Sequence, residues 1–487
     1  MKLSKLTALA LSIVLLLSCL TLPALAEDPV ELVVAYVCSE PADQQLVIDA
    51  MNEILLARYN LKIRTIVPNF SNYVQQLTLL LSSNEQLDIF SELGARFSSD
   101  VANGSLYDMT DLLAQKGQGI VSAIGEKYLA AGQVAGRQYA VTTFRDLAKG
   151  FSFFMRADLC DKYNIDTTKI TTLEQVGDAL KIIYENEPEI TPLCTTNTAY
   201  PSYRMTDVDQ LGDMMGVLLH MGQDLNVVNY YDTDEYEKLI RTFRDWFVKG
   251  YINADNVTSN ITHQEVMKAG QGFAYFDASK PNVVSEEEAK CGGYKIYECK
   301  IIPAFTYTAA PATLQWVITS KCKNPEAAMT FLNSLYTDAD VMNLIAWGIE
   351  GKHYVKTEDG HITYPEGVNA SNSGYNLMRG WAFGNQAITY IWEGNPLSAW
   401  DDLKQFNADA YVSKAFGFTW NATGYETEIA AVTAVFDEYR VALEFGLLDP
   451  DTYLPIFRQK LHDAGIDKIV ASKQEQLNAW AAANNVQ

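Results

Sequence analysis

The sequence predicts an α/β fold with mainly parallel central sheets. Two observations support this prediction: short runs rich in Val, Ile and Leu alternate with amphipathic segments from residue 31 onward, and 487 residues are enough for two or more folding units. An alternating order of strands and helices favours parallel strands, because the chain must cross over the sheet between them. Hydrophobic residues form 48% of the chain and charged residues 20%, which indicates a folded globular protein.

Hydrophobic periodicity gives the expected elements in chain order. Residues 31–37 are a β-branched run typical of a buried strand, and residues 44–59 have the apolar spacing of an amphipathic helix. Further elements are expected as strands over 61–67, 87–90, 272–277 and 313–319, and as a helix over 73–81. Asn324, Pro325 and Glu326 have the residue types of a helix start: a capping side chain, a proline in the first turn and a carboxylate near the positive end.

The first 26 residues have the pattern of a secretory signal peptide. Two lysines precede an apolar run over 6–22, and the small residues Ala24 and Ala26 mark a cleavage site. Lipid attachment at Cys19, within 16–19, is an alternative, but the residues after Cys19 stay apolar, which favours cleavage after Ala26. The protein is therefore expected to be exported, as an extracellular or surface-associated protein. No later segment is long and apolar enough to cross a membrane.

Charge and cysteine content narrow the possible partners. A net charge of −23 repels phosphate backbones, so no nucleic-acid partner is expected. Six cysteines follow the signal peptide, and only Cys291 and Cys299 are near enough in sequence to suggest a disulfide. Because the six are scattered over a long chain, most are expected to be small buried hydrophobic side chains.

The stretch from 374 to 400 is the most distinctive part of the chain. Tryptophans alternate there with polar side chains: Trp381, Trp392 and Trp400 with Arg379, Asn385, Gln386 and Glu393. Aromatic faces can stack on sugar rings while planar polar groups bond the hydroxyls, so this stretch is a candidate ligand-binding wall. The apolar spacing over 376–392 also fits a buried helix, which leaves a purely structural alternative open.

Other candidate binding residues follow strands or lie near expected lobe junctions. In parallel sheets, ligands bind beyond the carboxyl ends of the strands, which selects the loops 38–40, 91–97 and 143–146. The residues chosen in this way are Glu40, Glu92, Arg96, Arg145, Asp146 and Asp277, together with Trp316 and Trp347. A charge after a strand is often merely solvated, and a tryptophan is often a core residue.

Motifs spread over the mature chain resemble those of one protein family. Residues 103–113 and the segment 135–141 are similar to two of its signatures, although Arg137 stands where lysine is usual and Thr142 where proline is common. Residues 153–159 resemble its next strand. Residues 348–354, 373–376, 381–385 and 464–467 resemble a C-terminal region of its lipoprotein-type members. The family is that of bacterial extracellular solute-binding proteins of the carbohydrate type.

This resemblance implies a fold, a domain division and a role. It implies a type II periplasmic-binding-protein-like fold, with two α/β lobes joined by a multi-segment hinge. One lobe would comprise 27–148 and 300–336, and the other 149–299 and 337–487. The protein would be a monomer without a cofactor that captures a carbohydrate, expected to be an oligosaccharide, and delivers it to the membrane permease of an ABC importer.

Two other functions remain open from the residues alone. The five histidines form no helical zinc-binding pair, and the turn between His353 and His361 is typical of a hairpin rather than a metal site. No Gly-x-Ser-x-Gly motif or phosphate-binding loop is present, so neither catalytic residues nor metal ligands are predicted. A secreted glycosidase needs only two carboxylates brought together by folding, which 60 acidic residues leave possible. A peptide-binding importer subunit with the same closing lobes is the other alternative.

Overall fold

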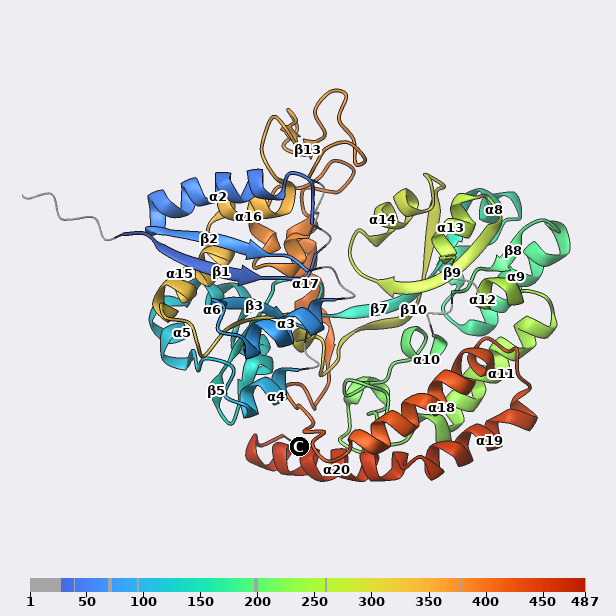
Figure 1. The fold of residues 1–487 in the computed structure, drawn as a ribbon. Helices are drawn as coiled ribbons and strands as arrows, with labels where there is room; N and C mark the ends of the chain where they lie inside the picture. Colours follow the sequence, from blue (N-terminus) through green and yellow to red (C-terminus); the bar gives the residue numbers. More distant parts are fainter. Residues whose placement is uncertain are drawn as a thin grey trace, which may run out of the picture.

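The computed structural model describes residues 28–38, 40–68, 72–93, 96–196, 200–258, 261–375 and 379–486. Two α/β lobes lie side by side, each built around a five-stranded sheet (Figure 1). The expected signal peptide, with Cys19, lies outside the described residues. Within the described residues, no helix is both long and apolar enough to cross a membrane.

The first sheet has the strand order β2-β1-β3-β11-β6. Its strands are β1 (Val30–Ala35), β2 (Leu61–Ile66), β3 (Ile89–Glu92), β6 (Ala140–Thr142) and β11 (Gln315–Ile318). β1 pairs in parallel with β2 and β3, whereas β11 runs antiparallel to both of its neighbours. Four of the five strands therefore point the same way, with their carboxyl ends at one edge.

Helices cover both faces of the first sheet. One face packs against α2 (Gln44–Tyr59), α5 (Thr110–Lys116), α6 (Gln118–Ile124), α15 (Pro325–Thr337) and α16 (Ala339–Trp347). The other face packs against α3 (Tyr73–Ser82) and α4 (Phe97–Ala102). The predicted helix over 44–59 has the observed bounds of α2. The helix start at Pro325 is also confirmed, but the Asn324 side chain makes no capping hydrogen bond.

The second sheet has the order β14-β10-β7-β9-β8. Its strands are β7 (Lys149–Arg156), β8 (Thr191–Leu193), β9 (Gly272–Ser279), β10 (Ile296–Thr306) and β14 (Tyr411–Val412). β7 runs antiparallel to β9 and β10, whereas β10 is parallel to β14 and β9 is parallel to β8. In this sheet too, one strand, β7, runs opposite to the other four. The surrounding helices are α8 (Ala157–Lys162), α9 (Leu173–Asn186), α10 (Pro201–Arg204), α11 (Asp234–Val248), α12 (Ala254–Thr258), α13 (His263–Lys268) and α14 (Val283–Lys290).

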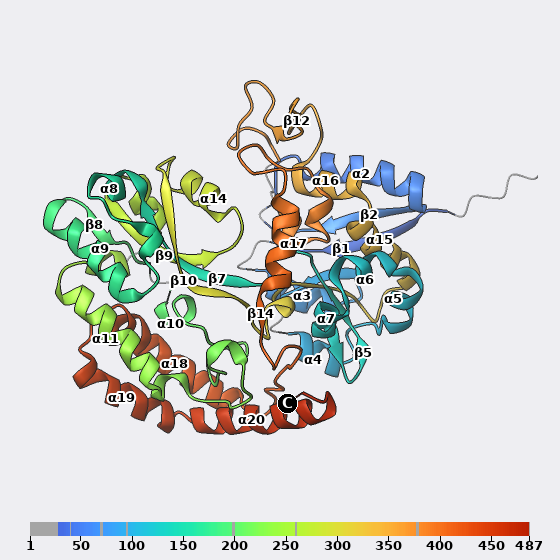
Figure 2. The same ribbon diagram turned by 180° about the vertical axis from the view of Figure 1, so that it is seen from behind.

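Three C-terminal helices form a layer beneath the second lobe. They are α18 (Glu426–Glu444), α19 (Pro450–Asp463) and α20 (Ile466–Ala483). Their apolar faces share one core with α11, in which Phe436, Leu443, Phe457 and Ile469 are buried. Figure 2 shows that α20 runs from this layer toward the first lobe, where the C-terminus lies.

The lobe boundaries differ from the expected ones at two places. Residues 337–375 and 379–409, expected in the second lobe, belong to the first, because α16 and α17 (Ala399–Asp409) place Ile345 and Leu403 in the core that contains Leu32. Residues 300–306, expected in the first lobe, lie in β10 of the second sheet. Amphipathic spacing shows that a helix has a buried face, but it does not show which core receives that face.

Three chain segments therefore cross between the lobes: β6 to β7, β10 to β11, and α17 to β14. The buried side chain of Asn407 ties the last crossing to the first. Its Oδ1 accepts hydrogen bonds from the N–H groups of Leu147 (3.0 Å) and Ala148 (3.2 Å), and its Nδ2 donates to the Arg145 carbonyl (2.7 Å). On the second crossing, Asp209 accepts a bond of 3.1 Å from the Thr308 N–H. The hinge is thus held by side chains as well as by the chain itself.

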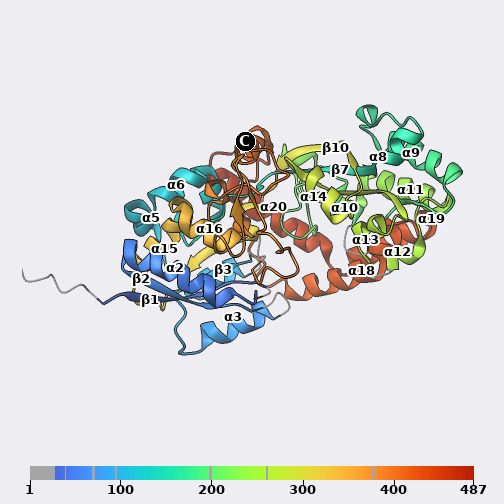
Figure 3. The ribbon, with the colours of Figure 1, turned by 90° about the horizontal axis from the view of Figure 1, so that it is seen from above.

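Residues 348–375 and 379–398 form an irregular insertion between α16 and α17. It contains a hairpin of β12 (Val355–Lys356) and β13 (Ile362–Thr363), which confirms the expected turn between His353 and His361. In the view from above it lies near the line where the lobes meet (Figure 3). Asn395 of the insertion is 3.5 Å from the Ser285 hydroxyl on α14, so it reaches the second lobe.

The six described cysteines are buried and form no disulfide with one another. The Cys291 sulfur lies 3.6 Å from the hydroxyl of Tyr275, and the Cys299 sulfur lies 3.9 Å from the sulfur of Met155. The suggested bond between Cys291 and Cys299 is therefore absent, whereas the expectation of buried hydrophobic thiols is confirmed.

Candidate functional site

Three polar side chains are buried at the carboxyl edge of the first sheet. Glu92 ends β3, and Gln315 of β11 pairs in register with Glu92 on one side and with Thr142 of β6 on the other. Gln315 is 0% exposed, and within the described part of the chain neither of its amide atoms has a hydrogen-bond partner. An unpaired buried amide is unfavourable by about 1–3 kcal/mol. This edge therefore has unused hydrogen-bonding capacity.

An aromatic group lies beside the carboxyl end of β1. Phe383 packs edge-on against Tyr36, with ring centroids 4.9 Å apart, and lies 5.6 Å from Trp316. The Trp316 indole donates to the Ala382 carbonyl (3.0 Å), which fixes the 3₁₀ turn Gly380–Ala382. Trp381, in that turn, is 39% exposed, whereas Trp316 is 1% exposed. Trp316 is thus a core residue, whereas Trp381 keeps a surface that a ligand can contact.

Trp347, the last residue of α16, meets Trp392 of the insertion. Their ring centroids are 5.5 Å apart, and Tyr364 packs edge-on against Trp392 at 4.6 Å. Both tryptophans are partly exposed. The two form an aromatic group separate from Phe383, and the described part of 376–392 contains 3₁₀ turns in place of the alternative buried helix.

At the carboxyl end of β9, Asp277 lies between two basic side chains. Arg204 of α10 forms an ion pair with it, and the His263 Nε2 lies 3.4 Å from its other oxygen. The His263 ring is buried and stacks on Tyr275 at 4.4 Å. Asp277 and Arg204 keep 20% and 32% side-chain exposure, so both can accept further partners.

Asp277→Asn is expected to lower the free energy of unfolding at pH 7 by about 2 kcal/mol. Burial raises the Asp277 pKa, but the hydrogen bond with His263 and the charge of Arg204 outweigh it and lower the pKa from 3.8 to about 2. A carboxyl group whose pKa is lower in the folded protein stabilises the fold at pH values above its pKa in the unfolded chain. This stabilisation amounts to about 1.4 kcal/mol per unit of pKa shift, and it is lost as the pH falls through the pKa of the folded protein. Urea denaturation should show the difference shrinking below about pH 4. A difference that does not change with pH would contradict this assignment.

Several predicted binding side chains are already engaged within the protein. Arg96 bonds Thr78 and Asp100, Arg145 bonds the Ala310 carbonyl in the hinge, and Asn385 caps the turn Gln386–Ile388 through the Ala387 N–H. The other predicted polar residues keep some exposure; these are Glu40, Asp146, Arg379 and Glu393. Burial raises the pKa of the Cys38 thiol, and the charge of Arg379 opposes that rise.

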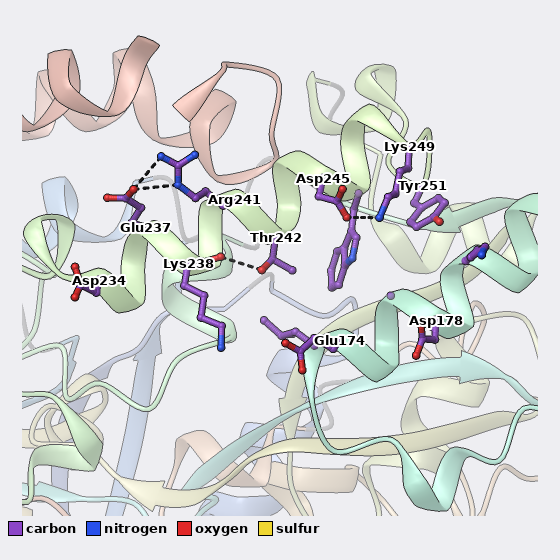
Figure 4. Close-up of a pocket in the computed structure, with 14 residues that line it drawn as sticks. Glu174, Asp178, Asp234, Glu237, Lys238, Arg241, Thr242, Asp245, Lys249 and Tyr251 are labelled. Carbon is purple, nitrogen blue, oxygen red and sulfur yellow. Dashed lines mark hydrogen bonds and ion pairs between the residues drawn. The ribbon is translucent and has the colours of Figure 1, made fainter. Parts of the chain in front are cut away.

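One cavity lies away from these groups. It has a volume of about 710 Å³ and lies between α9 and α11 in the second lobe, lined by Asp178, Trp246 and Tyr251 among others. Figure 4 shows its charged side chains turned toward one another: Arg241 to Glu237 and Lys249 to Asp245. Because these charges neutralise each other on one outer face, this cavity is a weaker candidate than the strand ends.

Sequence reasoning missed Gln315, Arg204 and Tyr364. Gln315 lies inside the strand expected over 313–319. The one signal that could have identified it is that a polar side chain interrupts the apolar run there. Arg204 is 73 residues from Asp277, so only the fold brings the two together. Tyr364 lies in the predicted hairpin, where aromatic residues carry no specific signal.

Comparison with known proteins decides the family. A family model described as "Bacterial extracellular solute-binding protein" matches residues 42–342. The chain belongs to this family. A second model, a domain of unknown function (DUF3502), matches residues 414–482, the region of the three C-terminal helices. The resemblance inferred from the motifs is confirmed.

Relatives of the family cover nearly the whole chain. A carbohydrate ABC transporter substrate-binding protein of Streptococcus pneumoniae serotype 4 is 25% identical over 433 residues, which are 88% of this chain and 86% of that protein. The crystal structure of the N-glycan transport solute-binding protein of S. pneumoniae has a TM-score of 0.83 at 24% identity and covers 92% of this chain and 98% of its own. An HMO-binding solute-binding protein from Bifidobacterium longum infantis has a TM-score of 0.64 at 15% identity, and the match covers 93% of this chain and 99% of that one. The predicted two-lobed α/β fold is confirmed.

Proposed function

We propose that this protein binds an oligosaccharide between its two lobes outside the cell and delivers it to the permease of an ABC importer. In this proposal the signal peptide is cleaved after Ala26, the mature protein is a monomer, and the ligand leaves chemically unchanged. Trp381 and the Trp347–Trp392 pair contact the ligand from the first lobe. Asp277 and Arg204 contact it from the second.

The exposed indole of Trp381 is the observation that carries this proposal. A large aromatic side chain left 39% exposed beside a strand end offers a flat apolar face, which suits the C–H face of a sugar ring. The Arg204–Asp277 pair adds groups that donate and accept hydrogen bonds, as sugar hydroxyls require. A peptide ligand would instead need groups for a terminal amine and carboxylate.

The relatives support both the ligand class and a movement of the lobes. The N-glycan transport protein is also solved with Man1GlcNAc and with Man5GlcNAc, and the TM-scores of these complexes to this chain are 0.73 and 0.71. The structure for which no ligand is named scores 0.83. The three structures of this one protein thus match the chain to different extents. Such a difference is expected if the two lobes change their relative orientation, as hinge closure requires.

Isothermal titration of the mature protein with neutral oligosaccharides, including Man5GlcNAc, and with a peptide mixture tests this function. A saccharide should bind in a one-to-one complex and be recovered intact. Binding of peptides alone would replace the proposal with a peptide importer subunit. Shortened saccharide after incubation would replace it with a glycosidase.

A further inference from the structure

Two side chains of α18 hold the short helix α10. Arg440 and Glu444 are one turn apart, so they lie on the same face of α18. The Arg440 guanidinium lies 4.0 Å from the ring centroid of Tyr200, directly before α10. Glu444 is 0% exposed and accepts a hydrogen bond of 2.9 Å from the N–H of Ser202, in the first turn of α10. The C-terminal region therefore holds the start of α10 in place through these two contacts.

The other end of α10 carries Arg204. A four-residue helix has almost no stability of its own, since helix nucleation is unfavourable, so its position depends on what it packs against. Ser202 is fully buried, whereas Arg204 is partly exposed and forms the ion pair with Asp277 at the end of β9. A shift at Ser202 would thus be transmitted over less than one turn to the Arg204–Asp277 pair.

We propose that the C-terminal region, residues 414–482, is a brace for α10. Arg440 and Glu444 act as positioning residues that set the orientation of Arg204, and with it the polar surface that the second lobe offers to the ligand. This inference rests on the proposed function in assigning Arg204 and Asp277 to the ligand. It gives a role to the region that matches a domain of unknown function.

The charge state of Glu444 supplies a readout that a merely structural side chain would lack. Burial raises its pKa to about 7, against the lowering effect of Arg440. Burial also raises the pKa of the four tyrosines that surround it, Tyr203, Tyr230, Tyr231 and Tyr236, so these hydroxyls stay neutral near pH 7. A raised pKa means that the buried site favours protonated Glu444 over the carboxylate, so a movement of α10 that hydrates this side chain becomes easier as Glu444 ionises. The hold on α10 should therefore weaken between pH 6 and pH 8.

Glu444→Gln tests the brace, with Glu438→Gln as its control. Glu438 lies on the same helix but is exposed and pairs with Lys460 (2.8 Å) on α19. Once corrected for the intrinsic pH dependence of exchange, amide opening over 200–206 should become roughly tenfold more frequent from pH 6 to pH 8 in the wild type and stay constant in Glu444→Gln. Man5GlcNAc should bind the wild type several-fold more weakly at pH 8 than at pH 6, and should bind Glu444→Gln equally at both. Glu438→Gln should match the wild type throughout.

Arg440→Met provides a second variant, because it removes the contact with Tyr200 while keeping an apolar stem. It should speed exchange in 200–206 at both pH values, with far-ultraviolet circular dichroism confirming that it is folded. Exchange that matches the wild type in both folded variants would overturn the brace even if the glycan binds. If Man5GlcNAc and the other saccharides do not bind the wild type, the proposed function fails, whereas the exchange experiment still decides the brace.

Discussion

Trp381→Ala is expected to weaken oligosaccharide binding by roughly 1–3 kcal/mol, which is about five- to 150-fold in Kd. The indole is exposed and lies in a turn held by Trp316 and Phe383, so its removal takes away a stacking surface without opening the core. Titration calorimetry with the bound saccharide measures the loss.

Tyr184→Ala is the matched control for Trp381→Ala, because Tyr184 is also an exposed aromatic residue, on the outer helix α9. It should leave affinity unchanged. Equal affinity of wild type and a folded Trp381→Ala protein would show that this tryptophan does not contact the ligand, and the observation that carries the proposed function would be lost.

Asn407→Leu is expected to lower the free energy of unfolding by about 2–4 kcal/mol. Leucine fills a similar volume but leaves the N–H groups of Leu147 and Ala148 and the Arg145 carbonyl without their hydrogen-bond partner in a buried hinge. Because these bonds join two crossings between the lobes, the variant should also sample a wider range of lobe orientations. Urea denaturation measures the first effect and X-ray scattering the second.

Gln405→Ala separates the hinge effect from a general weakening of α17. Gln405 lies on the same helix, is exposed, and bonds only Asp409 within the described residues (2.7 Å). Its loss should change the free energy of unfolding by less than about 0.5 kcal/mol. If Asn407→Leu proved no less stable than Gln405→Ala, the hydrogen bonds at Asn407 would not hold the hinge.

Local sequence patterns predicted the elements more accurately than their assembly. The α2 spacing and the β-branched run of β1 depend on neighbouring residues alone, so their bounds could be read within two residues. The hairpin after His353 was likewise predicted from its turn residues. Membership of a lobe depends on contacts far apart in sequence, such as those that place Leu403 in the core with Leu32, and periodicity carries no information about these.

The candidate site was only partly predictable for the same reason. Trp347 and Trp392 were selected separately, and the fold brings them together. Trp316 looked the same in sequence as Trp381, but strands on both sides bury it. Arg204 follows no strand and gains its candidate role only through its pairing with Asp277 and the hold of α18 on α10.

Small-angle X-ray scattering of the mature protein, with and without the saccharide identified by titration, tests capture between the lobes most directly. A ligand that contacts both lobes favours the closed arrangement in proportion to its preference for that arrangement. The radius of gyration should therefore fall on saturation with the saccharide and stay constant with a saccharide that does not bind. An unchanged radius of gyration at saturating, calorimetrically confirmed binding would contradict capture by closure of the two lobes.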